Sequence, residues 1–329
     1  HQADAKVVDK ARTEFAKTGE ILDESHPKYY IETSAQKNRN DAESFSNKQY
    51  GLINAFIYAM AFVGGLFADK LFGFRKSIFW GGILMAIGTF LMAVPGAFMF
   101  YFGVSILIVG NGFFKPNIST MIGSLYKDGD PRRDAGFSLF YSAINIGALL
   151  SGLTIAYIGT TYSWSLGFFI AGVTMLLGLA LFIFTQKTLG PIGLPPVAEK
   201  LEAKVSGLKK EWIYFAGTLL FIPVFFLLVY YPIDIDMTAI FGTTGKGEKY
   251  IVQFSDVIMI GAAIITLSYL IYEIRKSTRE EARKLIVAMI LILFSVLFWS
   301  FFEQGGGSLN FFANGNVQKH GLNMTQVNN

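Results

Sequence analysis

Lys115 is the residue whose position most needs a chemical explanation. It lies in an apolar run at 98–125, on one helical face with Asn111 and Ser119, four residues to either side. If this run crosses a membrane, the lysine costs at least ~2.5–3.5 kcal/mol and normally has a partner or a watery cavity. Lys127, the next basic residue, is about 18 Å away along the axis, so Lys115 is too deep to reach the surface. We interpret Lys115 as part of a polar path.

Two other apolar runs carry polar side chains at the depth of Lys115. Tyr58 is about 16 Å along its helix from Asp69, and Asn145 is about 18 Å from Arg133. Three polar groups from three helices would therefore reach one level near the middle of the membrane. Hydrogen bonds between helices, with no ligand, explain Tyr58 or Asn145 alone equally well. Their convergence on Lys115 favours a binding site.

The last apolar run places Ser295, Trp299 and Glu303 at four-residue spacing. Counted from Lys284, Glu303 should lie roughly 28 Å along the helix, toward the outer face. A carboxylate there can be a simple interfacial residue. Alternatively, Glu303 is an outer-gate acid that pairs with a basic residue and releases it when protonated. In that interpretation Gly305–Gly307 let the helix bend.

A short polar turn, GGLFADKLFGFRK at Gly64–Lys76, separates the first two apolar runs. Its glycines permit close helix packing, and Asp69, Arg75 and Lys76 can pair with one another or with helix ends. We favour a structural hinge here over a substrate contact.

The composition indicates that these patterns lie in a membrane. Hydrophobic residues make up 52% of the chain and charged residues 16%, and mean hydropathy is +0.44. This is too apolar for an ordinary soluble domain and predicts an all-α polytopic membrane protein. The net charge of +4 comes from basic residues in short loops, which the positive-inside rule explains better than nucleic-acid binding does.

Enzymatic and metal chemistry find no support in the sequence. There is no cysteine, and the three histidines are scattered. The motifs of zinc proteases, P-loops and serine hydrolases are absent as well. We therefore expect no catalytic residue, no metal site and no bound cofactor.

Apolar runs of sufficient length define the expected membrane helices, because about 20 residues span the hydrocarbon core. Eight such runs lie near 47–68, 76–95, 98–125, 134–158, 164–186, 211–232, 252–273 and 284–313. The loops between them alternate in charge. Those around Lys76, Arg133, Lys210 and Arg279 are basic, which predicts that they face the cytoplasm.

Three stretches carry a resemblance to a known family: GNGFFKPNIS from Gly110, LYKDGDPRRDAGFSLFYSAINIGAL from Leu125 and FWSFFEQGGGSL from Phe298. In this order and spacing they resemble the proton-dependent oligopeptide transporter family of the major facilitator superfamily. The resemblance implies the superfamily's fold, with helices 2–6 and 7 present here. Between them it implies the two extra helices of bacterial members. The turn at Asp69 resembles the cytoplasmic hairpin motif of the superfamily.

The resemblance also implies roles for single residues. Lys115 is similar to the family's helix-4 lysine, which serves proton coupling and substrate handling. Tyr58 and Asn145 resemble its peptide-binding tyrosine and asparagine. Trp299 is similar to a pocket tryptophan of helix 7, and Glu303 to the gating glutamate. The family's helix-1 ExxE[RK] motif and helices 8–12 are missing from this sequence, so we expect a fragment of a longer protein.

The expected organisation follows from this mapping. Residues 1–46 form a polar extramembrane segment, with a surface helix at Ala5–Leu22 and a loop from 26 to 47. The rest divides into an N-terminal bundle at 47–186, a cytoplasmic linker at 187–210, an inserted helix pair at 211–276, helix 7 opening the C-terminal bundle at 277–313 and a polar loop at 314–329.

The expected function is symport of di- and tripeptides with protons across a bacterial inner membrane, by alternating access between two bundles. The expected partners are the peptide, protons as the coupling ion, the lipid bilayer and the missing helices of the same protein. Two alternatives remain open: transport of another solute, such as nitrate or a sugar, and a non-transporting membrane receptor or assembly protein.

Overall fold

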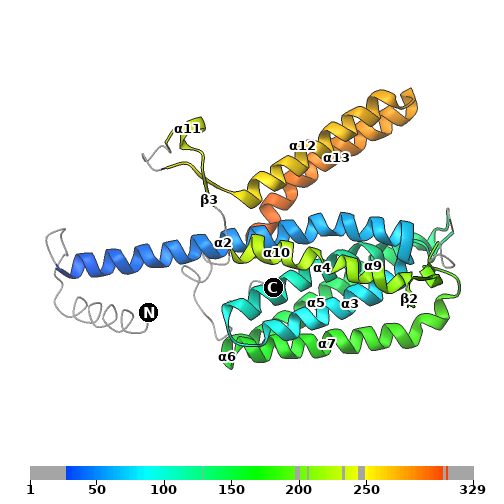
Figure 1. The fold of residues 1–329 in the computed structure, drawn as a ribbon, viewed down its shortest axis with the longest axis horizontal. Coiled ribbons are helices and arrows are strands. Elements are labelled where there is room, and N and C mark those ends of the chain that lie inside the picture. The colour runs from blue at the N-terminus through cyan, green and yellow to red at the C-terminus, as the bar shows by residue number, and fades with distance from the viewer. Residues whose placement is uncertain are drawn as a thin grey trace.

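The computed structural model describes residues 27–127, 129–196, 201–205, 207–231, 234–243, 249–306 and 309, most of them in long helices (Figure 1). The all-α class is confirmed, since the only β structure in these ranges is two short antiparallel strand pairs. The surface helix predicted at Ala5–Leu22 and the polar loop predicted at 314–329 lie outside the described residues.

The elements follow one another as a succession of long helices with short connections. The long helices are α2 (Pro27–Phe67), α3 (Gly73–Met92), α4 (Ala97–Gly123), α5 (Arg132–Ser151), α7 (Trp164–Thr185), α12 (Phe254–Lys276) and α13 (Arg279–Phe302). The shorter helices are α6 (Tyr157–Thr161), α9 (Lys210–Thr218), α10 (Phe221–Tyr230) and α11 (Thr238–Phe241). Two π-helical turns, η1 (Ala68–Phe72) and η2 (Gly152–Ala156), and two 3-10 turns, η3 (Gln186–Leu189) and η4 (Glu303–Gly306), join or end them. The strand pairs are β1 (Lys204–Val205) with β2 (Leu208–Lys209), and β3 (Asp234–Asp236) with β4 (Ile251–Gln253).

Seven helical stretches in the described part of the chain are long and apolar enough to cross a membrane. The sequence predicts eight, and the difference arises because the first two predicted runs fall within one stretch, Ser44–Met92, of 49 residues. The π-helical turn η1 joins α2 to α3 with no non-helical residue between them. The chain nevertheless reverses there, at Gly73, whose φ of 71° suits glycine (Figure 1).

The loop predicted from residue 26 to 47 is wrong from its second residue onward, because α2 is already helical from Pro27. The prediction relied on asparagine and serine, which favour turns but do not forbid a helix. Proline suits the first position of a helix, and residues 28–50 contain no glycine and no further proline. Nothing in this segment therefore stops the helix.

Helices α3 and α4 pack with their backbones in contact. A Cβ atom on Gly81 would lie 2.6 Å from the carbonyl oxygen of Gly110, and one on Gly88 would lie 2.6 Å from that of Gly103. Only residues without a side chain permit such an approach. Large side chains on both sides of this seam, such as Phe113 of α4, are fully buried.

Helix α2 crosses the other side of α4 next to Lys115. Pro116 cannot donate a hydrogen bond to the carbonyl of Gly112, and Gly64 of α2 packs directly on this carbonyl. The buried Asn117 ties the two helices together, because its Nδ2 donates to the carbonyl oxygen of Gly64 at 3.3 Å. The backbone of α4 at Lys115 is therefore held at a fixed place beside α2.

The predicted run at 211–232 is two helices, α9 and α10, that pack on the outside of α3 and α4. Pro223 breaks the run because its ring clashes with the carbonyl of Leu219, four residues earlier. The Phe215 ring stacks on those of Trp80 and Phe72, at centroid distances of 4.7 and 4.4 Å. This half of the predicted insertion is therefore attached to the N-terminal helices.

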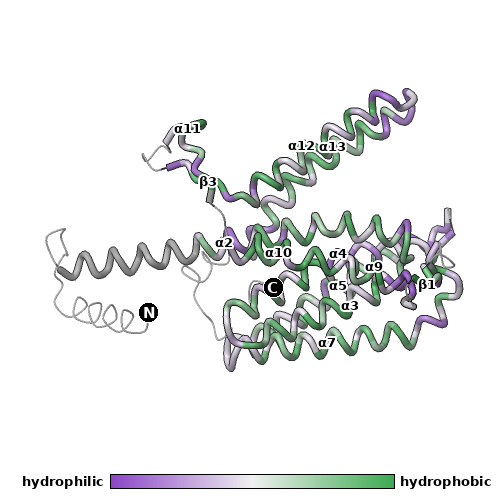
Figure 2. The backbone as a smooth tube through the Cα atoms, in the orientation of Figure 1, coloured by the Kyte–Doolittle hydropathy of each residue, from purple (hydrophilic) through white to green (hydrophobic). Residues whose placement is uncertain are grey.

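Helices α12 and α13 form a hairpin that leans away from the other helices and meets α2 at one end (Figure 1). Both begin with a capping box, Gln253 with Asp256 and Thr278 with Glu281. No described side chain of α13 is buried. Hydrophilic residues gather at the tip of this hairpin and at the end of the bundle where β1 lies (Figure 2). The apolar middle and polar ends suit a bilayer.

Candidate functional site

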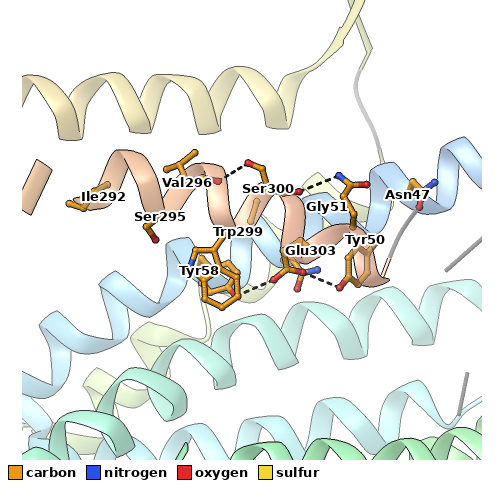
Figure 3. Close-up of a pocket in the computed structure, with 13 residues that line it drawn as sticks. Asn47, Tyr50, Gly51, Tyr58, Ile292, Ser295, Val296, Trp299, Ser300 and Glu303 are labelled. Atoms are coloured by element: carbon orange, nitrogen blue, oxygen red, sulfur yellow. Dashed lines mark hydrogen bonds between the residues drawn. The ribbon is translucent and has the colours of Figure 1, made fainter. Parts of the chain in front are cut away.

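A cavity of about 700 Å³ lies between α2 and the C-terminal end of α13 (Figure 3). Its lining comes from these two helices and the η4 turn: Asn47, Tyr50, Gly51, Asn54, Ala55, Tyr58, Ile292, Ser295, Val296, Trp299, Ser300, Glu303 and Gln304. The cavity therefore joins the first predicted membrane segment to the last.

Four-residue spacing places polar side chains on the facing sides of both helices. Tyr50, Asn54 and Tyr58 form one stripe on α2, because residues four apart lie above one another on a helix. The predicted stripe of Ser295, Trp299 and Glu303 on α13 faces it across the cavity. Two stripes that carry polar side chains, one on α2 and one on α13, thus meet at one place.

Glu303 accepts a hydrogen bond on each of its carboxylate oxygens. The Tyr50 hydroxyl donates to Oε2 at 3.1 Å, and the Tyr58 hydroxyl donates to Oε1 at 3.3 Å (Figure 3). The sequence places Glu303 further out than Tyr58 unless the helices lean, and the structure brings the two side chains into contact. The depth estimate assumed parallel, upright helices, whereas the α12–α13 hairpin leans away from the other helices and meets α2 at one end (Figure 1).

Tyr58 also links Glu303 to Lys115. The Lys115 ammonium lies 5.0 Å from the centroid of the Tyr58 ring, within the range of a cation–π contact. The Trp299 ring lies 6.2 Å from the Tyr58 ring, tilted by 54°. Tyr58 therefore meets the lysine on its face and the carboxylate at its hydroxyl. Within the described ranges Glu303 binds two phenols and forms no ion pair with a basic residue.

Asn145 is the predicted site residue that the structure does not bring to this cluster. Its Nδ2 donates to the carbonyl oxygen of Tyr141 in its own helix, at 2.8 Å. No described residue of α5 is buried, so α5 has few neighbours to fix its rotation toward the cavity. Counting residues predicts how deep Asn145 lies along α5. It does not predict toward which neighbouring helix the side chain points.

Tyr50 is the cavity residue that the sequence reasoning missed. Its signal was present, because Tyr50 and Tyr58 stand eight residues apart with Asn54 between them. A second tyrosine on the same face of an apolar helix is easily taken for packing. Its contact with Glu303, 253 positions away, is what identifies it.

The residues of the predicted hairpin motif fasten the α2–α3 turn to the linker and to α9. Lys76 forms an ion pair with Glu211 at 2.7 Å. Arg75 donates from its guanidinium to the carbonyl of Gly190, and from its backbone N–H to that of Gly193 at 3.0 Å. Asp69 is exposed on η1. The contacts of Arg75 and Lys76 are structural, as the hinge interpretation expects.

A second polar cavity, of about 540 Å³, lies at the α4–α5 end of the path. Its lining includes Ser119 and Arg133, which places it one turn beyond Lys115. In the adjoining loop, hydrogen bonds from Arg132 lower the pKa of Asp130 to about 2. This loop therefore keeps a carboxylate beside its arginines at any physiological pH.

Proteins similar to this chain in sequence are named as transporters. The chain is 32% identical over 282 residues to the peptide transporter YePEPT of Yersinia enterocolitica subsp. palearctica serotype O:3 (strain YE-P4), covering 80% of this chain and 50% of that protein. It is 30% identical over 280 residues to dipeptide and tripeptide permease A of Pectobacterium carotovorum subsp. carotovorum (strain PC1), covering 84% and 50%. The chain spans about half the length of these relatives.

The fold is also similar to that of a solved structure. A crystal structure of a peptide transporter, POT, in complex with sulfate matches with a TM-score of 0.61 at 30% identity, over 84% of this chain and 55% of that one. The family model described as "PTR2: POT family" matches residues 75–329. This range contains the motifs around Lys115, Asn145 and Glu303, and it covers most of the sequence. The chain belongs to the POT family.

Proposed function

We propose that the protein transports di- and tripeptides together with protons, by alternating access across a bacterial inner membrane. The observation that carries this proposal is the cavity between α2 and α13, which Tyr58 and Glu303 line. Tyr58 donates a hydrogen bond to Glu303 and carries Lys115 on the face of its ring, so the three residues are connected. The names of the relatives support the choice of peptides. We propose no catalytic activity and no cofactor besides the coupling proton.

The cavity has the chemistry that a short peptide needs. A dipeptide at neutral pH carries one ammonium and one carboxylate, and groups of both signs are rare inside membranes unless they serve a path. Lys115 would attract the peptide carboxylate, and Tyr58 would exchange hydrogen bonds with the peptide. Trp299 would cover its apolar parts. A volume of about 700 Å³ is in the usual range for small-molecule sites.

Glu303 would carry the response to protons. An ionised carboxylate can accept a hydrogen bond on both oxygens. Once protonated, it donates from one oxygen, so one of the two tyrosine hydroxyls loses its acceptor. Protonation would therefore loosen the contact between α2 and α13. In the proposed division of the chain, α2 belongs to the N-terminal bundle and α13 opens the C-terminal one. Loosening their contact would let the bundles rock.

The orientation in the membrane follows from the charges of the loops. We propose that the basic turn at Lys76 and the basic tip between α12 and α13 face the cytoplasm, as the positive-inside rule requires. The Lys76–Glu211 pair would then lie on the cytoplasmic side. A bacterial inner membrane is supported by the bacterial relatives.

Uptake by the full-length protein in liposomes tests the proposal. We expect an imposed proton gradient to drive accumulation of a labelled dipeptide, and Lys115→Ala to reduce it at least tenfold. Lys127→Ala, in the loop at the end of the same helix, is the matched control and should transport normally. Uptake insensitive to both the gradient and Lys115 would contradict symport. Uptake that unlabelled dipeptide cannot displace would indicate another solute, and no uptake would indicate a receptor or assembly protein.

A further inference from the structure

We infer that Tyr50 is a positioning residue for Glu303, and that Tyr50 and Tyr58 together hold this carboxylate in the cavity between the two halves of the transporter. This inference rests on the proposed function, and it assigns to Tyr50 a role that neither the motifs nor the relatives' names provide. Three observations carry it: the hydrogen-bond geometry, the place of Glu303 on α13, and the different surroundings of the two tyrosines.

The geometry gives each phenol its own oxygen. Tyr50 and Tyr58 stand eight residues apart, about 12 Å along α2, yet their hydroxyls reach Oε2 and Oε1 of one carboxylate. The two side chains therefore converge on Glu303 from opposite ends of the cavity (Figure 3). Such a bridge fixes the direction of the carboxylate, which a single hydrogen bond would leave free to rotate.

Glu303 needs these donors because of its place on α13. It is the C-cap residue of the helix, where the partial negative charge of the backbone carbonyls disfavours another negative group. The donors come from α2, across the cavity. Among the described residues Glu303 forms no ion pair, and Lys115 contacts the ring of Tyr58. The two phenols therefore supply the hydrogen bonds that hold the carboxyl group in place.

The two tyrosines differ in what else they touch. Tyr58 contacts Lys115 and Trp299, so a peptide in the cavity would compete for it. Tyr50 lies at the other end of the cavity, toward Asn47, and its hydroxyl is used by Glu303. When Tyr58 turns to a peptide, Tyr50 keeps Glu303 pointed into the cavity. Tyr50 acts through Glu303 and does not need to touch the substrate.

The experiment separates driven transport from exchange in the full-length protein in liposomes. Tyr50→Phe removes one hydroxyl and keeps the ring. We expect it to lower the maximal rate of gradient-driven dipeptide uptake about fivefold, the effect of losing one typical, solvent-exposed hydrogen bond, and to change KM less than about twofold. Exchange of internal for external peptide, which needs no net proton movement, should change less than about twofold. Tyr162→Phe, on an exposed tyrosine at the end of α6, is the control and should match the wild type.

Combination with Glu303→Gln decides whether the two residues act together. If Tyr50 acts through Glu303, then adding Tyr50→Phe to Glu303→Gln causes no further loss of driven uptake. Losses that multiply, a rise in KM as large as that of Tyr58→Phe, or an equal loss of exchange would overturn the inference. A wild type that does not take up dipeptide rejects the proposed function instead. In that case the wild type, Tyr50→Phe, Glu303→Gln and the double variant, compared by thermal unfolding in detergent, must still show coupled shifts for Tyr50 and Glu303, and additive shifts would refute the contact.

Discussion

Helix α2 makes two kinds of contact that differ in the groups that form them. Toward α4 it offers Gly64, which packs on the backbone at Gly112, with the buried Asn117 bonded across the crossing. Toward α13 it offers two partly exposed tyrosines that reach a single carboxylate across a cavity. The first contact fills space and has one arrangement. The second is made of a few polar groups that can separate into water or onto a ligand, as a moving interface requires.

We expect the largest effect on stability from a substitution where α3 and α4 pack through glycines. Gly110→Ala places a Cβ 2.8 Å from the carbonyl oxygen of Gly81, so α3 and α4 must move apart. We expect a loss of about 2–3 kcal/mol in the free energy of unfolding, measured by thermal or denaturant unfolding in detergent. Gly178→Ala on α7 is the control, because its Cβ would meet nothing within 4 Å. It should be neutral or slightly stabilising, and equal behaviour of the two variants would refute the close packing.

At the α2–α13 contact we expect the reverse: a large effect on transport and a small one on stability. Glu303→Gln keeps the shape of the side chain and removes the titratable charge. Gradient-driven uptake should fall about tenfold, while unfolding changes by less than about 1 kcal/mol because both hydrogen bonds are partly exposed to solvent. A stability loss comparable with that of Gly110→Ala would show that this contact is part of the fixed core.

The ion pair between Lys76 and Glu211 should contribute to stability but little to transport. It is partly exposed, with 33% of the Lys76 side chain and 15% of the Glu211 side chain accessible. We expect a coupling energy of about 0.5–1 kcal/mol from a double-mutant cycle with Lys76→Met and Glu211→Gln. Transport should change little. A loss of driven uptake as large as that of Glu303→Gln would assign the hairpin motif a role in coupling.

The smallest expected effect is on the titration of Asp236, in the β3–β4 hairpin outside the membrane spans. Hydrogen bonds from Thr238 and then Lys249 lower the pKa of Asp236 to about 2, from an ordinary value of 3.8. A lowered carboxylate pKa means that the contribution to stability is complete above the ordinary value and is lost as the pH falls toward 2. Carbon NMR of labelled aspartate should show this titration, and Thr238→Ala should raise its midpoint. An unchanged midpoint would contradict the hydrogen bonds.

The sequence predicted the helices well because long apolar runs leave a membrane chain few other conformations. It also predicted the stripe of Ser295, Trp299 and Glu303, since four-residue spacing on a helix fixes a face. It could not predict how far α13 leans, and so the contact between Glu303 and the residues of α2 stayed conditional on that lean. The face of Asn145 and the role of Tyr50 depend on neighbours distant in sequence, and no local pattern specifies these. The loop predicted before residue 47 failed because turn-forming residues lower helix propensity without breaking a helix.

The most direct test compares the two contacts in one experiment. This sequence contains no cysteine, and any cysteine elsewhere in the full-length protein is first replaced by serine. Spin labels are then attached to Phe62→Cys with Leu291→Cys, across α2 and α13, and to Ile87→Cys with Phe98→Cys, across α3 and α4. All four positions are exposed. Distances are then measured in the full-length protein in liposomes, with and without dipeptide and at two values of pH. We predict that the α2–α13 distance distribution shifts with peptide and protons while the α3–α4 distribution stays fixed. An α2–α13 distance that never changes, or a shift of equal size in both pairs, would contradict a movable site on a fixed core.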